Sequence, residues 1–104
     1  MKNSEGYNNI SDVRDEIDRI DRAILKLLAN RKEFVEAIVK FKTDEESVVA
    51  EDRQQRVYRM RREWAEELGL NPDLIEKLYR QLIKHNIKHE LKLLKNNPQQ
   101  INDV

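Results

Sequence analysis

The sequence of 104 residues contains no cysteine and no long apolar run. Because disulfide bonds are excluded, nothing in the chain requires an oxidising compartment. Residues 1–9 lack the apolar segment of a signal peptide, and no stretch approaches the roughly 20 apolar residues of a membrane-spanning helix. We therefore expect a soluble, cytoplasmic protein with no membrane partner.

Glycine and proline are equally scarce, with two residues of each. Gly6 and Pro98 fall in polar ends of the chain, whereas Gly69 and Pro72 lie close together. Residues 7–68 therefore contain neither of the residues that interrupt helices. Since strand-like alternation of apolar and polar residues is also absent, we expect an all-α fold.

The chain also lacks an excess of charge of either sign, with 20 Lys and Arg residues against 20 Asp and Glu residues. A neutral chain is poorly suited to a nucleic-acid partner held by phosphate contacts, and we expect none. A glycine-rich phosphate loop and a nucleophile paired with a base are missing too. Any chemistry should depend on positioning and charge rather than on covalent catalysis.

The first of three predicted helices is unusually long. Ser11, followed by Asp12, is a suitable N-cap, and an apolar pattern continues from there to about Phe41, which gives roughly 30 residues of helix. The segment TDEESVVA, residues 43–50, then breaks the pattern.

Two shorter helices follow. The second ends at Gly69, which can adopt the left-handed conformation that terminates helices. Asn71 caps the third, with Pro72 at its first position. Its apolar face consists of Ile75, Leu78, Leu82, Ile83, Ile87, Leu91 and Leu94. We expect one helical domain with two flexible tails, over residues 10–95, 1–9 and 96–104 respectively.

The first helix carries a heptad seam that is apolar except at one position. The apolar members are Ile10, Val13, Ile17, Ile20, Ile24, Leu27, Phe34, Ile38 and Phe41. The exception is Arg31. A helix of this length spans about 45 Å, too long for two shorter helices of the same chain to cover. We therefore expect an intertwined homodimer in which a two-fold axis pairs the long helices antiparallel.

Arg31 could take part in a shared cationic site. Arg31 and Lys42 are 11 residues apart, which places them on one face of a continuous helix, about 16 Å apart at the backbone. Arg14 is too far along its own helix to join them, but an antiparallel partner would bring its Arg14 level with residues 34–36. Arg53 adds a cation at the first turn of the second helix, where backbone N–H groups favour an anion. Several converging cations without matching acids would need an anionic ligand.

A second interpretation of Arg31 remains open. A single arginine in a heptad seam can simply fix the register of two helices or pair with a nearby glutamate. Under that interpretation the chain is a non-catalytic dimerisation or regulatory module, each cation is paired with an acid, and there is no pocket.

The third helix places two polar residues where apolar ones would suit a core. Asn86 and Glu90 continue the row of Leu82, so they either face a site or turn this edge of the helix to solvent. His85 and His89 are four residues apart and could hold a metal, but no acidic third ligand accompanies them at a familiar spacing. We expect no metal site.

Three segments resemble the all-helical chorismate mutase family, and most closely its isochorismate-pyruvate lyase branch. They read DVRDEIDRIDRAILKLLANRKEFVEAIVKFK, EDRQQRV and LIKHNIKHEL, and the resemblance runs from about Ile10 to Leu94. FKTDEES and RREWAEELGL favour the lyase branch. The resemblance implies an intertwined homodimer of three-helix chains, no cofactor, and a small dicarboxylate substrate, isochorismate or chorismate.

The resemblance also implies roles for individual residues. Arg14 of the partner chain would contact a substrate carboxylate, and Arg31 would bind the carboxylate of the enolpyruvyl group. Lys42 would lie at the ether oxygen, with 43–50 as a mobile lid, and Arg53 on the ring side. Glu90 stands where the family usually has a glutamine that donates a hydrogen bond to the same ether oxygen.

Two residues depart from the mutase pattern. Gln54 follows Arg53, where mutases generally carry an acid that holds the ring hydroxyl, and this favours the lyase, although a glutamine can also bind a hydroxyl. Glu90 can donate a hydrogen bond only when it is protonated. Burial would favour the neutral acid, whereas nearby cations would favour the carboxylate. Lyase and mutase activity both remain open.

Overall fold

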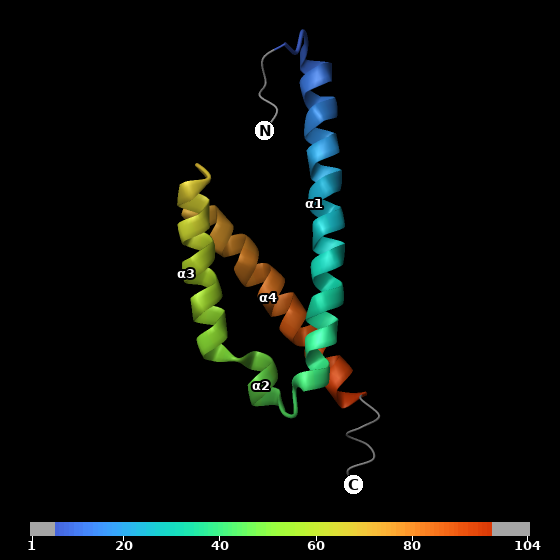
Figure 1. Cartoon of the computed structure of the whole chain (residues 1–104), viewed down its shortest axis with the longest axis vertical. Helices are drawn as coiled ribbons and strands as arrows, with labels where there is room; N and C mark the ends of the chain where they lie inside the picture. Colours follow the sequence, from blue (N-terminus) through green and yellow to red (C-terminus); the bar gives the residue numbers. More distant parts are fainter. Residues whose placement is uncertain (1–5, 97–104) are drawn as a thin grey trace. The chain divides into compact units, whose positions relative to one another are not determined.

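The computed structural model describes residues 6–96, and every regular element in that range is helical (Figure 1). The elements in chain order are α1 (Ile10–Ile38), the short 3-10 helix η1 (Val39–Phe41), α2 (Glu45–Val49), α3 (Glu51–Glu67) and α4 (Pro72–Lys95). The predicted all-α fold is confirmed. Most of both predicted tails, residues 1–5 and 97–104, lies outside the described residues.

Helix α1 has 29 residues, close to the predicted length. Its start differs from the prediction: the helix begins at Ile10, and the side chain of Asn9 accepts a hydrogen bond of 2.9 Å from the N–H of Asp12. Asn9 therefore caps α1, and Ser11 lies inside the helix. Both residue types are good N-caps, so composition alone did not choose between them.

The first helix also ends earlier than predicted. Its α-helical part stops at Ile38, and residues 39–41 tighten into η1. The next residues do not form a plain loop, because they contain α2. Asp44 caps α2 by accepting a hydrogen bond of 2.8 Å from the N–H of Ser47.

Helices α3 and α4 form a hairpin whose turn follows the sequence signals. Gly69 adopts a φ of 73°, in the left-handed region, and the N–H of Leu70 donates to the carbonyl of Ala65 at 2.8 Å. Asn71 then accepts hydrogen bonds from Asp73 and Leu74 at the start of α4. The predicted caps of this turn are confirmed.

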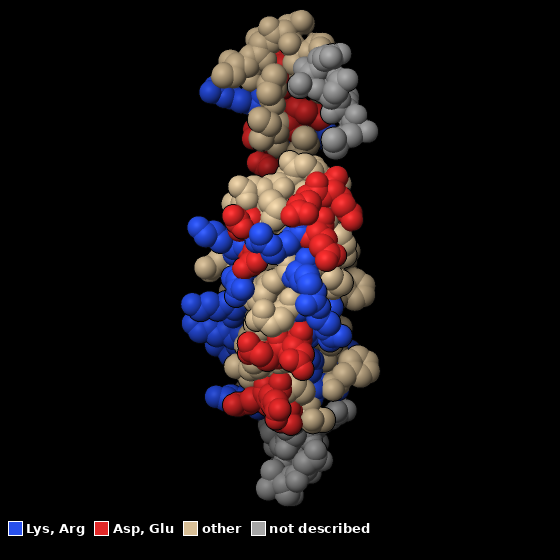
Figure 2. Space-filling model, turned by 90° about the vertical axis from the view of Figure 1, so that its left-hand side faces the viewer, with Lys and Arg blue, Asp and Glu red and all other residues tan. Residues whose placement is uncertain are grey.

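Charged side chains also link the two helices of the hairpin. Arg62 of α3 contacts Asp73 at 2.9 Å and Glu76 at 3.2 Å, and Arg80 donates to Glu76 at 2.8 Å. The face of the molecule drawn in Figure 2 accordingly shows blue and red side chains interspersed. Since these pairs are largely solvent-exposed, each should contribute little to stability.

The structure divides into two units, Met1–Phe34 and Val35–Val104. The second unit has a small core in which Val39 of η1, Val48 of α2 and Leu94 of α4 are 5%, 3% and 4% exposed. Three further side chains of α4 pack against this core, Ile87, Leu91 and Leu93. The core therefore fixes η1 and α2 on the C-terminal half of α4.

Helix α1, which begins in the first unit, contains no buried residue. Its apolar side chains at the predicted seam positions are all exposed, for example Ile17 by 50% and Leu27 by 67%. No helix among the described residues is long and apolar enough to cross a membrane.

Candidate active site

Lys42 lies directly after η1, on extended backbone with φ of −97° and ψ of 136°. Its N–H donates to the carbonyl of Val39 at 3.0 Å. The prediction that Lys42 lies on the same helical face as Arg31 is therefore wrong. The α-helix stops at Ile38, and the chain continues as a 3-10 helix and then as extended backbone at Lys42.

The side chain of Lys42 is half-buried, and its ammonium group donates a hydrogen bond to the backbone carbonyl of Ser47. Ser47 also engages the residues that follow Lys42. Its hydroxyl accepts from the backbone N–H groups of Thr43 and Asp44, both at 3.3 Å, and donates to the carbonyl of Asp44 at 2.9 Å. One serine thus organises residues 42–44.

Asp44 completes this arrangement from the other side. The hydrogen bonds from the backbone and the hydroxyl of Ser47 stabilise its charged form and hold the pKa of the Asp44 carboxyl below its usual range. A reciprocal pair of bonds between an N-cap and the residue three positions later satisfies two backbone donors that the start of a helix leaves open. The start of α2 is therefore well defined although the helix has only five residues.

The other end of α2 is held by Gln54. Its side-chain amide donates to the carbonyl of Val49 at 2.7 Å and accepts from the hydroxyl of Tyr58 at 3.4 Å. Tyr58 is buried, and the guanidinium of Arg80 lies 4.2 Å from the centre of its ring. The predicted site residues Lys42 and Gln54 are thus brought to the same short helix, where each binds one carbonyl.

Ala50 joins α2 to α3 in the left-handed conformation, with φ of 45° and ψ of 60°. Among the residues that the structure describes, it is the one non-glycine residue with a positive φ. A side chain in this region costs of the order of 1 kcal/mol. The strain lies at the end of the same short helix that contacts Lys42.

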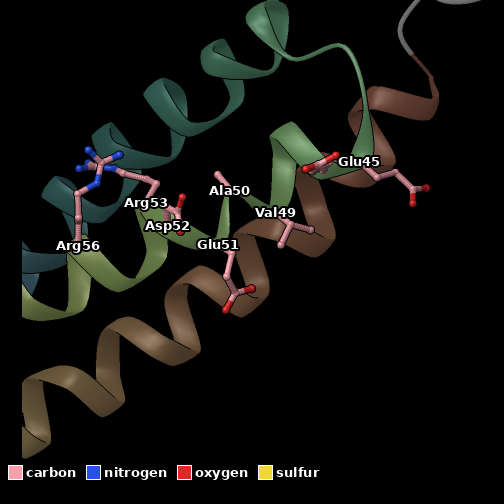
Figure 3. A pocket seen from close by; sticks show the side chains of 8 residues that line it. Glu45, Val49, Ala50, Glu51, Asp52, Arg53 and Arg56 are labelled. Carbon is pink, nitrogen blue, oxygen red and sulfur yellow. The ribbon is translucent and has the colours of Figure 1, made fainter.

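Arg53 is exposed on the first turn of α3 and, together with Arg56, lines a depression on the surface (Figure 3). The other lining residues are Glu45, Glu46, Val49, Ala50, Glu51 and Asp52. Four of these are acids, and two of the acids occupy the first turn of α3. The expectation that this helix start favours an anion is therefore weakened, because Glu51 and Asp52 already satisfy its positive end.

Glu90 of α4 is buried, with 7% of its surface exposed, and is the one charged residue in the buried set of residues 6–96. The alternative in which Glu90 faces solvent is wrong. Asn86, one turn earlier, is half-buried. Burying a carboxyl is costly unless its environment is polar, so this position is under stronger constraint than the exposed lysines around it.

The histidines of α4 behave differently from each other. The Nε2 atom of His89 lies 2.9 Å from a carboxyl oxygen of Glu36, whereas His85 is exposed. Within the described range no three His, Cys, Asp or Glu residues are grouped so that they could hold a metal ion.

Arg14 and Arg31 belong to the first unit and lie on α1. Arg14 is exposed and Arg31 is half-buried. Their convergence with the cations of the second unit stays a prediction.

Sequence reasoning missed the contribution of Ser47 and Tyr58. The first could have been found, since Asp44 and Ser47 have the spacing of an N-cap and its reciprocal partner. The second could have been found as well, since Tyr58 is four residues after Gln54 on the same helix, where side chains at this spacing are neighbours.

Comparison with known proteins gives this arrangement its context. The family profile of chorismate mutase type II matches residues 13–91. The chain is 36% identical over 92 residues to the isochorismate pyruvate lyase of Pseudomonas aeruginosa, which covers 88% of this chain and 91% of that protein.

Two further relatives are T-proteins. That of Enterobacter agglomerans is 35% identical over 79 residues, and that of Haemophilus influenzae is 33% identical over 82 residues. The matches cover 75% and 78% of this chain but only 21% and 22% of those proteins. Because the family profile spans most of the helical part, from α1 to α4, the chain belongs to the chorismate mutase type II family.

Proposed function

We propose that the chain is an isochorismate-pyruvate lyase that converts isochorismate into salicylate and pyruvate without a cofactor. The observation that carries this proposal is the similarity to the lyase of Pseudomonas aeruginosa, which extends over nearly the whole of both chains. The absence of a nucleophile–base pair from the sequence also agrees with a pericyclic reaction, in which bonds rearrange within one substrate.

Lys42 is the catalytic cation of this proposal. When the ether C–O bond breaks, negative charge gathers on its oxygen, and a fixed ammonium group stabilises that charge more in the transition state than in the substrate. The ammonium has three N–H donors and uses one on Ser47. Two donors remain for the substrate.

Glu90 is proposed as the second group at the ether oxygen. A protonated carboxyl can donate to that oxygen, whereas a carboxylate can only accept and would repel the growing charge. The burial of Glu90 supports this assignment, since loss of contact with water raises the cost of the charged form of a carboxyl. Its neighbour along the helix, Asn86, is proposed to bind the substrate.

Arg31 and the partner chain's copy of Arg14 are proposed to clamp the two carboxylates, in a site shared across an intertwined antiparallel homodimer. The exposed seam of α1 supports a second copy, because an apolar stripe repeated along a helix of 29 residues needs a cover. A contiguous seam is also what a two-fold antiparallel pairing requires.

Arg53 and Gln54 are proposed to contact the ring side of the substrate. Gln54 uses one of its two amide N–H donors on Val49, so one donor remains for a ring hydroxyl. An amide in place of the acid expected in mutases supports the lyase over the mutase.

A dedicated chorismate mutase, which forms prephenate, is the second candidate. The match to the chorismate mutase type II profile favours it. A non-catalytic helical dimerisation or regulatory module is a third alternative. The half-buried position of Lys42 and the burial of Glu90 give it no support.

The deciding experiment supplies isochorismate and chorismate separately to the purified protein. Release of salicylate and pyruvate from isochorismate is the expected result, with slower or no formation of prephenate from chorismate. Prephenate as the faster product would replace the lyase with the mutase. Thermal unfolding with a dicarboxylate transition-state mimic separates the module from both enzymes, because a ligand that binds only the folded state must raise the midpoint.

A further inference from the structure

Helix α2 is too short to satisfy its own backbone. In a helix the last four carbonyls have no partner within the helix, and α2 has only five residues. The carbonyl of Glu46 accepts from the N–H of Ala50. The carbonyls of Ser47 and Val49 accept instead from the side chains of Lys42 and Gln54.

The position of the Ser47 carbonyl is itself fixed from three directions. The Asp44 cap holds the N–H of Ser47, the serine hydroxyl binds the backbone of Thr43 and Asp44, and the next residue, Val48, is 3% exposed in the core. Val48 packs with Val39 and Leu94, which come from η1 and α4. The acceptor that Lys42 binds is therefore attached to a packed core, although it belongs to a helix of only five residues.

We propose that Asp44 and Ser47 are positioning residues for the reaction, which fix the Lys42 ammonium through the capped α2. This inference rests on the proposed function, because it names what holds the catalytic cation of that site. A lysine side chain is a flexible chain of four methylene groups. Its ammonium charge therefore stabilises a transition state effectively only where other groups hold it in place. The cap supplies that constraint without contacting the substrate.

A comparison of Asp44→Ala with Asp44→Ser tests the proposal. Alanine removes the cap, whereas serine is a good N-cap residue without a charge. We expect Asp44→Ala to lower kcat about fivefold to tenfold with KM within about twofold, and Asp44→Ser to restore most of the loss. Glu45→Ala, which removes an exposed acid from the same first turn, is the matched control and should keep kcat.

Ser47→Ala should lower kcat in the same way. It keeps the backbone carbonyl group that Lys42 binds but removes the hydroxyl that binds residues 43 and 44. Circular dichroism and sedimentation of each variant check that the helical fold and the oligomeric state are retained. An equal loss of kcat in Asp44→Ser and Asp44→Ala would overturn the proposal, because the effect would then follow the charge and not the cap.

A labelling experiment decides the same question without activity. Trace acetylation by acetic anhydride, followed by mass spectrometry, reports how readily the Lys42 amine reacts. We expect severalfold faster labelling of Lys42 in Asp44→Ala and Ser47→Ala than in the unmodified chain, with Lys40 unchanged. Unchanged labelling of Lys42 in both variants would overturn the positioning role. If the unmodified chain converts neither isochorismate nor chorismate, the proposed function fails, and the labelling still shows whether the cap holds Lys42.

Discussion

Helix α1 and the segment after it differ in whether their apolar side chains are buried. The 29 residues of α1 include no buried side chain, and its seam is exposed along the whole helix. The following 3-10 helix, α2 and α4 share a core of Val39, Val48 and Leu94. The starts of α2 and α4 are capped by the side chains of Asp44 and Asn71. The difference teaches that the second unit has a core of its own, whereas the exposed seam of α1 supports the proposed homodimer.

The largest expected effect lies in the second unit. Lys42→Ala should lower kcat by about 10²- to 10³-fold, as expected for loss of one fixed group that stabilises developing charge. Arg31→Ala, in α1, should also raise KM, because it removes a carboxylate contact made in the ground state. Lys40→Ala is the control, since Lys40 is an exposed lysine two residues away. Equal and mild effects of Lys42→Ala and Arg31→Ala in steady-state kinetics would contradict the assigned roles.

A charge in the seam should affect assembly rather than chemistry. We expect Ile20→Asp to dissociate the proposed homodimer into monomers and to lower the unfolding midpoint, because the seam is apolar on both sides of this position. Sedimentation velocity measures the first effect and thermal unfolding the second. Ala29→Asp adds the same charge to an exposed position opposite the seam and should leave the dimer intact. Dimers of unchanged stability in Ile20→Asp would remove α1 from the interface.

The buried acid of α4 predicts a smaller effect that depends on pH. If Glu90 donates to the ether oxygen it must be protonated, so activity should rise as pH falls from neutral until the fold or the substrate is compromised. Glu90→Gln supplies a neutral donor of similar shape, and should flatten this rise and increase turnover near pH 7. The measurement compares the pH profiles of kcat for the unmodified protein and for Glu90→Gln. Identical profiles would take Glu90 out of the catalytic set.

The smallest effect concerns the strained junction after α2. Ala50→Gly should stabilise the protein by about 0.5 to 1 kcal/mol, because glycine adopts the left-handed conformation without a steric penalty. Ala29→Gly, in the middle of α1, should destabilise by a similar amount, since glycine weakens a helix interior. Urea unfolding at one protein concentration compares the two. A loss of stability in Ala50→Gly would show that Ala50 is not strained.

The parts of the fold that could be predicted depend on local signals. Gly69, Asn71 and Pro72 determine their turn through their own backbone preferences, so the sequence was sufficient there. The start of α1 was misassigned by two residues because Asn9 and Ser11 are both competent caps. The end of α1 was misassigned because residues 39–41 follow the packing of Val39 and not the helical period.

The candidate site could be predicted only in part for the same reason. The residue types at Lys42 and Glu90 are visible in the sequence, and the burial of Glu90 agrees with its place in an apolar row. The contacts of Lys42 with Ser47 and of Gln54 with Val49 are not visible, because they depend on how α2 folds between two other elements. The left-handed conformation of Ala50 could not be predicted, since alanine is not a residue that favours a positive φ.

The most direct test of the account is complementation between Arg14→Ala and Lys42→Ala chains. If α1 of one chain completes the site of the other, each mixed dimer contains one site with both cations and one site with neither. Random exchange of equal amounts should then restore about a quarter of the activity per site of the unmodified protein, although each variant alone is nearly inactive. Mass spectrometry verifies that the chains have exchanged. If activity does not recover after verified exchange, the result contradicts the shared site.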